Sequence, residues 1–331
     1  MSAPAPWITR QLGELVPRSG HAWLIHGPSG LGQYEIGLEL ARAWLCAAAT
    51  PRGACGVCSS CHQVDARVHP DLFVLLPETL ALEKGWPLDE KTQEDPDSKK
   101  RKPSREIKVD AARAMVSFSQ ITRSGGTCKV VLIYPAERMN QVTANTLLKT
   151  LEEPPGESRF ILCSEGADLL LATLRSRCQQ YALRWPGQEE ALAWLVEQGM
   201  EPSEAAALLG VAGGRPDLAL RYAADGRLAA SWRELPQALA RGQTGVFADW
   251  PLAEVVEALQ KLCHDQMAVK VGAKPRFFPS SAVKEAGSMQ ALQQWSKELL
   301  DSARVVEHPL NPGLMLETLV WQARNALNST H

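Results

Sequence analysis

The sequence predicts an α/β domain built on a parallel sheet, followed by a region made only of helices. Up to residue 185, short apolar runs typical of buried strands alternate with stretches of helical periodicity. After Pro186 the apolar residues recur only at helical spacing. A chain of 331 residues is also too long for one ordinary core, so we expect two or three domains.

The predicted strands are short and apolar, and helical patterns separate them. They cover residues 22–26, 72–76, 129–134, 160–163 and 180–185. Strands that alternate with helices in this way indicate a parallel sheet covered on both faces.

The helical region divides at a break near Asp225 and Gly226. The predicted helices cover residues 189–198, 203–209, 216–224, 229–240, 252–270, 289–304 and 312–327. We therefore predict three domains, which span residues 1–185, 186–226 and 227–331.

One segment of the first domain differs in composition. Residues 89–103 contain none of the hydrophobic side chains that build a core, so this stretch cannot bury anything. We predict an exposed loop over residues 82–105. The basic run Lys99–Lys102 is typical of a solvated tether, and contact with DNA is the alternative.

The bulk composition excludes several classes of protein. The chain has 35 Lys and Arg residues and 37 Asp and Glu residues. The molecule as a whole therefore lacks the net positive charge that is typical of proteins that bind nucleic acid. No apolar run reaches the roughly 18 residues that a membrane helix needs, and Met1–Gly20 has no apolar signal core. We therefore expect a cytoplasmic protein whose eight cysteines do not form a disulfide framework.

A degenerate phosphate loop follows the first predicted strand. A functional P-loop reads G-x-x-x-x-G-K-[ST]: its backbone amides hold phosphates, its Lys reaches the β- and γ-phosphates, and its hydroxyl holds magnesium. Gly27, Gly30 and Gly32 keep the glycine frame. Gln33 replaces the Lys, and Tyr34 replaces the Ser or Thr. The frame is present, while the cation and the magnesium ligand are missing.

The acidic half of such a site is also missing. In an active P-loop enzyme, a carboxylate at the end of a neighbouring strand binds magnesium. Here the strand at residues 129–134 leads into Tyr134 and Pro135, and Glu137 lies beyond the strand end. A chance glycine-rich turn is the alternative, but two defects in one frame favour an ancestral P-loop that neither binds nor hydrolyses ATP.

Four of the cysteines form a metal-binding pattern. Cys55, Cys58 and Cys61 follow a C-x-x-C-x-x-C spacing, and Cys46 lies upstream at the end of the P-loop helix. Four thiolates complete a closed tetrahedral site, so we predict a structural zinc module at residues 46–61. An iron–sulfur cluster and free thiols are the alternatives.

The chain resembles the delta-prime subunits of bacterial DNA polymerase III clamp loaders over roughly residues 20–185. The resemblance rests on motifs in the same order: His21–Ile25 before the loop, the four-cysteine pattern, His69–Asp71, Ile107–Asp110, Ala144–Pro155 and Leu174–Cys178. The C-terminal half is similar mainly in its helical character. The resemblance implies an AAA+ fold with a small helical lid domain and an all-helical C-terminal collar domain.

The resemblance also implies a role for the Ser-Arg-Cys motif, which in that family supplies an arginine to ATP bound on a neighbouring subunit. Here the motif is Ser176, Arg177 and Cys178, so Arg177 is the predicted arginine finger. From the residues alone, a surface salt bridge is the simpler interpretation of Arg177. Active relatives carry a further arginine in the lid, where this chain has Pro216, preceded by Arg215.

The function implied by the resemblance is that of a non-hydrolysing subunit. Its expected partners are gamma/tau-type ATPase subunits and a delta-type clamp-opening subunit, in an assembly that places a sliding clamp on primed DNA. No catalytic activity is expected of the isolated chain. The alternatives are an active AAA+ ATPase, which the missing Lys disfavours, and a zinc-dependent DNA-binding protein. The second is disfavoured because only Arg52 and Arg67 lie near the cysteines, without aromatic residues for base stacking.

Overall fold

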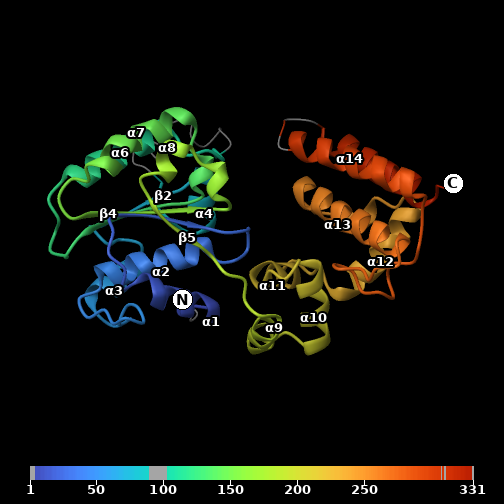
Figure 1. Cartoon of the computed structure of the whole chain (residues 1–331), viewed down its shortest axis with the longest axis horizontal. Coiled ribbons are helices and arrows are strands. Elements are labelled where there is room, and N and C mark those ends of the chain that lie inside the picture. The colour runs from blue at the N-terminus through green and yellow to red at the C-terminus, as the bar shows by residue number, and fades with distance from the viewer. Residues whose placement is uncertain (1–3, 89–102, 307, 309–310, 330–331) are drawn as a thin grey trace. The chain divides into compact units, whose positions relative to one another are not determined.

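The computed structural model, shown in Figure 1, describes residues 4–88, 103–306, 308 and 311–329. The chain divides into two compact units, Met1–Pro186 and Gly187–His331. The first unit contains the sheet. The second contains helices and no strand within the ranges just given.

Parallel strands form the sheet of the first unit. They are β1 (Ala22–His26), β2 (Leu72–Leu75), β3 (Lys129–Ile133), β4 (Ser158–Ser164) and β5 (Gln179–Ala182). Their order is β2-β3-β4-β1-β5, and every neighbouring pair is parallel, which confirms the predicted sheet. β5 ends earlier than predicted, because Ala182 pairs with His26, the last residue of β1.

Helices cover both faces of this sheet. They are α1 (Pro6–Leu15), α2 (Gln33–Leu45), α3 (Ser59–Asp65), α4 (Glu78–Glu83), α6 (Val109–Gln120), α7 (Gln141–Glu152) and α8 (Ala172–Arg175), with 3-10 turns η1 (Ala136–Arg138) and η2 (Ala167–Leu169). One face carries α6, α7 and α8, and the other carries α1, α2 and α3 (Figure 1). Between the sheet and the helices α6 and α7, buried side chains that include Met115, Leu147 and Phe160 form a hydrophobic core.

The helix α2 lies close against the sheet at Gly37. A Cβ at this position would lie 2.7 Å from Sγ of Cys163 and 2.8 Å from Cδ1 of Leu132, so no side chain fits there. This contact with β3 and β4 positions the helix that begins at the phosphate-loop frame and ends at Cys46.

The helix α1 is not among the elements predicted above. Ile8, Leu12 and Leu15 recur at the i, i+4, i+7 spacing of one helix face and are buried. Pro6 occupies the first turn, where the missing N–H would have no partner within the helix. The signal for this helix was therefore present in the sequence.

The predicted exposed loop over residues 82–105 is wrong at its N-terminal end. The helix α4 continues to Glu83, and Trp86 is only 9% exposed. This part precedes the charged run and contains an aromatic side chain that the first unit buries. Residues 89–102, and with them Lys99–Lys102, lie outside the residues that the structure describes.

The second unit is built from helices. They are α9 (Gln188–Glu197), α10 (Pro202–Val211), α11 (Pro216–Ala224), α12 (Ala229–Ala240), α13 (Leu252–Lys270), α14 (Met289–Val305) and α15 (Pro312–Leu327), with the 3-10 turn η3 (Gly245–Phe247). The bounds of α11, α12, α13 and α15 agree with the prediction. Within the described ranges, no helix combines the length and the apolar character required to cross a membrane.

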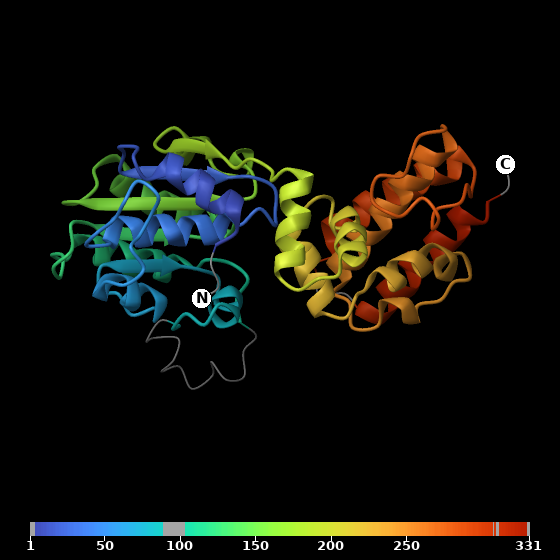
Figure 2. The ribbon, with the colours of Figure 1, turned by 90° about the horizontal axis from the view of Figure 1, so that it is seen from below.

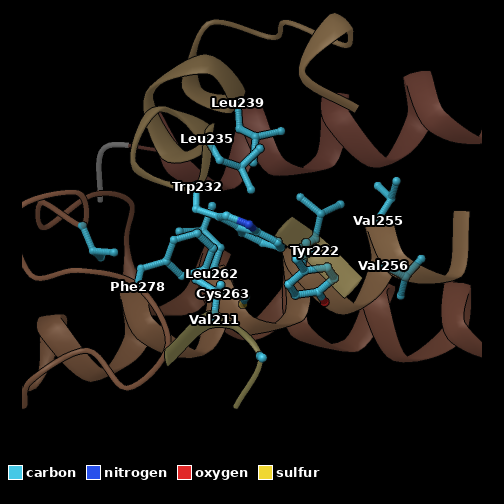
Figure 3. Close-up of a cluster of buried hydrophobic side chains, with 14 of the residues drawn as sticks. Val211, Tyr222, Trp232, Leu235, Leu239, Val255, Val256, Leu262, Cys263 and Phe278 are labelled. Carbon is cyan, nitrogen blue, oxygen red and sulfur yellow. The ribbon is translucent and has the colours of Figure 1, made fainter. Parts of the chain in front are cut away.

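One hydrophobic core joins these helices (Figure 3). Within this core, the ring centroid of Trp232 lies 5.1 Å from that of Tyr222, 5.0 Å from that of Trp250 and 6.0 Å from that of Phe278. Tyr222 and Trp232 lie on opposite sides of the predicted boundary at residue 226. The separation into a lid and a collar domain therefore stays a prediction.

A buried carboxylate in α13 holds the loop that follows this helix. Oδ1 of Asp265 accepts a hydrogen bond from the backbone N–H of Arg276 at 2.9 Å. Oδ2 accepts from the N–H groups of Phe277 and Phe278, each at 2.8 Å. Asp265 is fully buried, and these bonds satisfy a charge that would otherwise be costly to bury.

We expect Asp265→Asn to lower the free energy of unfolding by about 1–3 kcal/mol. An asparagine amide presents N–H donors to backbone N–H groups, so at least one of these groups loses its acceptor. Denaturant unfolding followed by tryptophan fluorescence measures the change. Asp301→Asn is the control, because Asp301 is exposed, and its effect should stay within about 0.5 kcal/mol. Equal effects of the two variants would contradict the role of Asp265.

Candidate functional site

The glycine frame lies at the position that a phosphate loop occupies. It connects the end of β1 at His26 to the start of α2 at Gln33. Gly30 has a φ of 83° and Gly32 a φ of 84°, a region that L side chains rarely adopt. A Cβ at Gly32 would also lie 2.6 Å from Cδ1 of Ile8, so α1 packs directly against the loop.

The side chain of Gln33 is turned into the loop. It is 2% exposed, and its Nε2 donates to the carbonyl oxygen of Pro28 at 2.8 Å and to that of Gly27. Where a functional P-loop has a cation that faces phosphate, this chain has a neutral amide bonded to its own backbone.

Tyr34 is buried where a P-loop has its magnesium-binding hydroxyl. Its phenol oxygen accepts a hydrogen bond from Nε1 of Trp86 at 2.6 Å, and Nζ of Lys84 lies 4.4 Å from its ring centroid. Its ring centroid lies 5.6 Å from that of Tyr134. Burial raises the pKa of both Tyr34 and Tyr134, so both phenols stay neutral.

Trp86 is a residue of this site that the sequence analysis missed. It belongs to the segment predicted as exposed, and its contact with Tyr34 joins that segment to the phosphate loop. The available signal was that Trp86 is the one aromatic residue between residues 78 and 105 of the sequence.

The end of β3 lacks a carboxylate, as predicted. The strand ends at Ile133, and Tyr134 and Pro135 follow it. Glu137 lies in η1, where its Oε1 accepts a hydrogen bond from the backbone N–H of Glu165 at 3.1 Å. This carboxylate oxygen is thus bonded to the loop after β4.

The four predicted metal ligands lie together. The Sγ atoms of Cys46, Cys55, Cys58 and Cys61 are all within 4.8 Å of one another. The separation is 3.8 Å from Cys46 to Cys58, 4.0 Å from Cys55 to Cys61 and 3.5 Å from Cys58 to Cys61. A tetrahedron with Zn–S bonds of about 2.3 Å has sulfur atoms about 3.8 Å apart, so the four thiols fit zinc.

Two helix ends and the turn between them create this arrangement. Cys46 is the C-cap of α2, Cys58 is the N-cap of α3, and Cys61 lies within α3. The backbone N–H groups of Ala48 and Cys55 donate to Sγ of Cys46 at 3.4 and 3.2 Å. Such donors stabilise the thiolate form that binds a metal.

The thiols of the cluster differ in acidity. Hydrogen bonds from backbone N–H groups, above all that of Cys61, lower the pKa of Cys58 to about 6. Burial raises the pKa of Cys61 to about 12. Cys58 is therefore the thiol of this pair that ionises first at neutral pH, and metal binding would have to release the proton of Cys61.

Arg177 lies just after the short helix α8, at the surface of the first unit. Its Nε donates to Oε1 of Glu152 at 2.7 Å, and its Nη1 donates to the carbonyl oxygen of Thr173 at 2.8 Å. Ser176 is exposed, and its hydroxyl donates to the same carbonyl at 3.1 Å. Burial raises the pKa of Cys178 to about 12, so this thiol is neutral.

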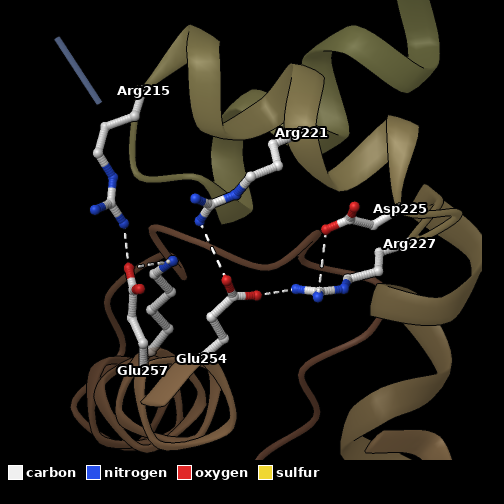
Figure 4. A network of polar contacts seen from close by, with 7 residues as sticks. Arg215, Arg221, Asp225, Arg227, Glu254 and Glu257 are labelled. Carbon is white, nitrogen blue, oxygen red and sulfur yellow. Dashed lines mark hydrogen bonds and ion pairs between the residues drawn. The ribbon is translucent and has the colours of Figure 1, made fainter. Parts of the chain in front are cut away.

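Arg215 is bonded within the second unit. Its Nε donates to the carbonyl oxygen of Ala212 at 2.8 Å, and its guanidinium pairs with Glu257 of α13 (Figure 4). Pro216 is buried in the first turn of α11. That Pro216 takes the place of a lid arginine stays a prediction of the resemblance, and the neighbouring Arg215 is paired with a carboxylate of its own unit.

These features define a class of protein and then a family. A parallel sheet in the order β2-β3-β4-β1-β5, with a phosphate-loop frame after β1 and a helical second unit, is the AAA+ architecture. The family described as "DNA polymerase III, delta subunit" matches residues 16–186. The chain is 32% identical over 349 aligned positions to the Pseudomonas aeruginosa protein "DNA polymerase III subunit delta'", covering 96% of each. The chain therefore belongs to the DNA polymerase III delta' subunit family.

Other relatives agree with this assignment. The Escherichia coli "DNA polymerase III subunit delta'" is 33% identical over 65% of this chain and 59% of that protein. The "DNA polymerase III subunit tau" of Salmonella typhimurium is 29% identical over 50% of this chain and 22% of that protein. The family predicted from the sequence motifs is thereby confirmed, while the roles of individual residues stay predictions.

Proposed function

We propose that this chain is a non-hydrolysing subunit of a DNA polymerase III clamp loader. The observation that carries the proposal is the state of the phosphate loop. The amide of Gln33 bonds to the loop's own carbonyl groups, and the phenol oxygen of the buried Tyr34 accepts a hydrogen bond from Trp86. Neither side chain is available to a nucleotide or to magnesium. Tyr134 and Pro135 directly follow β3, and Oε1 of Glu137 is bonded to the backbone N–H of Glu165.

The chain contributes Arg177 to the ATP site of a neighbouring subunit. It lies at the surface, with its side chain 30% exposed. A guanidinium that reaches the γ-phosphate of ATP on a neighbouring subunit stabilises the charge of the transferring phosphoryl group. Ser176 and Cys178 flank it and belong to the same short turn.

The four-cysteine group holds zinc in a structural role. Four thiol ligands leave no open coordination position, so a metal here supplies stability to the turn between α2 and α3 and no catalysis. The cysteine group lies at the C-terminal end of α2, where a bound zinc ion would fasten α2 to α3.

The proposed partners follow from the family. Gamma/tau-type ATPase subunits bind and hydrolyse the ATP, and the similarity to a tau subunit supports this relationship. The helices of the second unit of this chain bind the neighbouring subunits and hold the complex together. A delta-type subunit opens the sliding clamp. The assembled complex then places the clamp on primed DNA in the cytoplasm.

We expect the isolated chain to show no micromolar binding of Mg-ATP in a calorimetric titration. A gamma/tau-type subunit titrated in the same buffer is the positive control.

Gln33→Lys should not create hydrolysis, because Tyr134 and Pro135 still provide no magnesium ligand. A micromolar Kd would contradict the proposed loss of nucleotide binding, and turnover in addition would favour an active AAA+ ATPase. Binding of primed DNA that a zinc chelator abolishes would favour a zinc-dependent DNA-binding protein.

A further inference from the structure

Arg177 already has an anionic partner within its own chain. Nε of Arg177 donates to Oε1 of Glu152 at 2.7 Å, and its Nη2 group bonds to the same oxygen. Nη1 donates to the carbonyl oxygen of Thr173 at 2.8 Å. The side chain of Arg177 is 30% exposed and that of Glu152 is 46% exposed, so solvent and a neighbouring molecule reach both.

The position of Glu152 at the C-terminal end of α7 explains why it pairs with Arg177. Glu152 is the last residue of α7, and a carboxylate at the negative end of a helix dipole is disfavoured unless a cation lies next to it. Arg177 is that cation. The pair holds the guanidinium against α7 and α8, so Arg177 must leave Glu152 before it can bind a phosphate on another subunit.

We propose that Glu152 is a counter-ion that retains Arg177 on its own subunit until a neighbour's triphosphate displaces it. This inference rests on the trans-acting role proposed for Arg177. A triphosphate carries more charge than one carboxylate and accepts bidentate hydrogen bonds from a guanidinium. A solvent-facing ion pair shifts an equilibrium by no more than about fivefold, so a nucleotide overcomes it readily. Glu152 is thus a positioning residue that holds Arg177 on its own subunit and weakens its engagement with the neighbour's nucleotide.

The test measures how nucleotide changes the affinity of the full-length chain for a clamp loader that lacks only this subunit. Affinity is measured with and without a slowly hydrolysed ATP analogue, and the ratio is the nucleotide-dependent increment. Glu152→Gln keeps the shape of the side chain and removes its charge. We expect it to raise the increment about two- to fivefold, with the affinity in the absence of nucleotide unchanged.

Glu153→Gln is the matched control. It removes the same charge from the next residue, which is exposed, and no ion pair of its carboxylate is found in the described part of the chain. The increment should therefore not change. A Glu152→Gln increment that falls or stays the same would overturn the counter-ion role, and so would equal effects of the two variants.

Arg177→Ala separates this inference from the proposed function. We expect Arg177→Ala to abolish the increment, and the double variant with Glu152→Gln to behave like Arg177→Ala alone. If Arg177→Ala keeps the increment, the trans-acting role itself is wrong. If Arg177→Ala abolishes it and Glu152→Gln leaves it unchanged, only the role of Glu152 is refuted.

Discussion

Arg177→Ala is expected to stop ATP turnover at the interface to which we propose that Arg177 contributes, while the chain stays folded and assembles. Loss of an arginine finger reduces the rate by about 10³–10⁵. Folding should survive, because a solvent-facing ion pair such as Arg177–Glu152 contributes at most about 1 kcal/mol. Total turnover by the reconstituted complex should fall by less than this factor, since the substitution leaves the other ATP sites of the complex unchanged. Clamp loading and ATP hydrolysis measured in one preparation give the two readouts.

Arg175→Ala is the internal control for this experiment. Arg175 is the last residue of α8, so the substitution removes a guanidinium from the same turn. We expect ATP turnover and clamp loading to stay close to those of the unmodified complex. Identical behaviour of the two variants, or an Arg177→Ala variant with no effect in an intact complex, would show that Arg177 only forms a surface ion pair.

Purified protein is expected to contain about one zinc ion per chain, and Cys58→Ser should remove it. Loss of a direct ligand should weaken zinc binding by more than about 100-fold, because loss of residues that only support a ligand already costs 10–100-fold. The turn that joins α2 to α3 then loses its cross-link, and the thermal unfolding midpoint should fall. The sheet should persist, since its core around Phe160 is formed elsewhere. Elemental analysis, circular dichroism and thermal unfolding measure these effects.

Cys263→Ser is the matched control for the zinc prediction. Sγ of Cys263 donates to the carbonyl oxygen of Leu292 at 3.3 Å in the second unit, and a serine hydroxyl can donate in its place. Its zinc content should equal that of the unmodified protein. Iron with visible absorbance, a protein without metal, or equal zinc loss in the two variants would refute the zinc assignment.

The sequence by itself determined the parallel sheet, the degenerate phosphate loop and the cysteine group. Each of these depends on residues that are close in the chain or on a short periodicity. The strand β1 has its predicted bounds because an apolar run ends at the glycine frame. Cys55, Cys58 and Cys61 are separated by single turns of backbone, so folding brings them together with little dependence on the rest of the molecule.

The tertiary structure alone decided which distant side chains meet. Trp86 bonds to Tyr34 across 52 residues, and Arg177 pairs with Glu152 across 25. The carboxylate of Asp265 accepts hydrogen bonds from the backbone N–H groups of Phe277 and Phe278. No local sequence pattern indicates that these N–H groups need this acceptor. Periodicity predicts which face of a helix is buried, but the partner on the other side depends on the order of the strands and on the packing of helices between them. The Ser-Arg-Cys motif therefore indicated Arg177, whereas its counter-ion became visible only once α7 and α8 lay side by side.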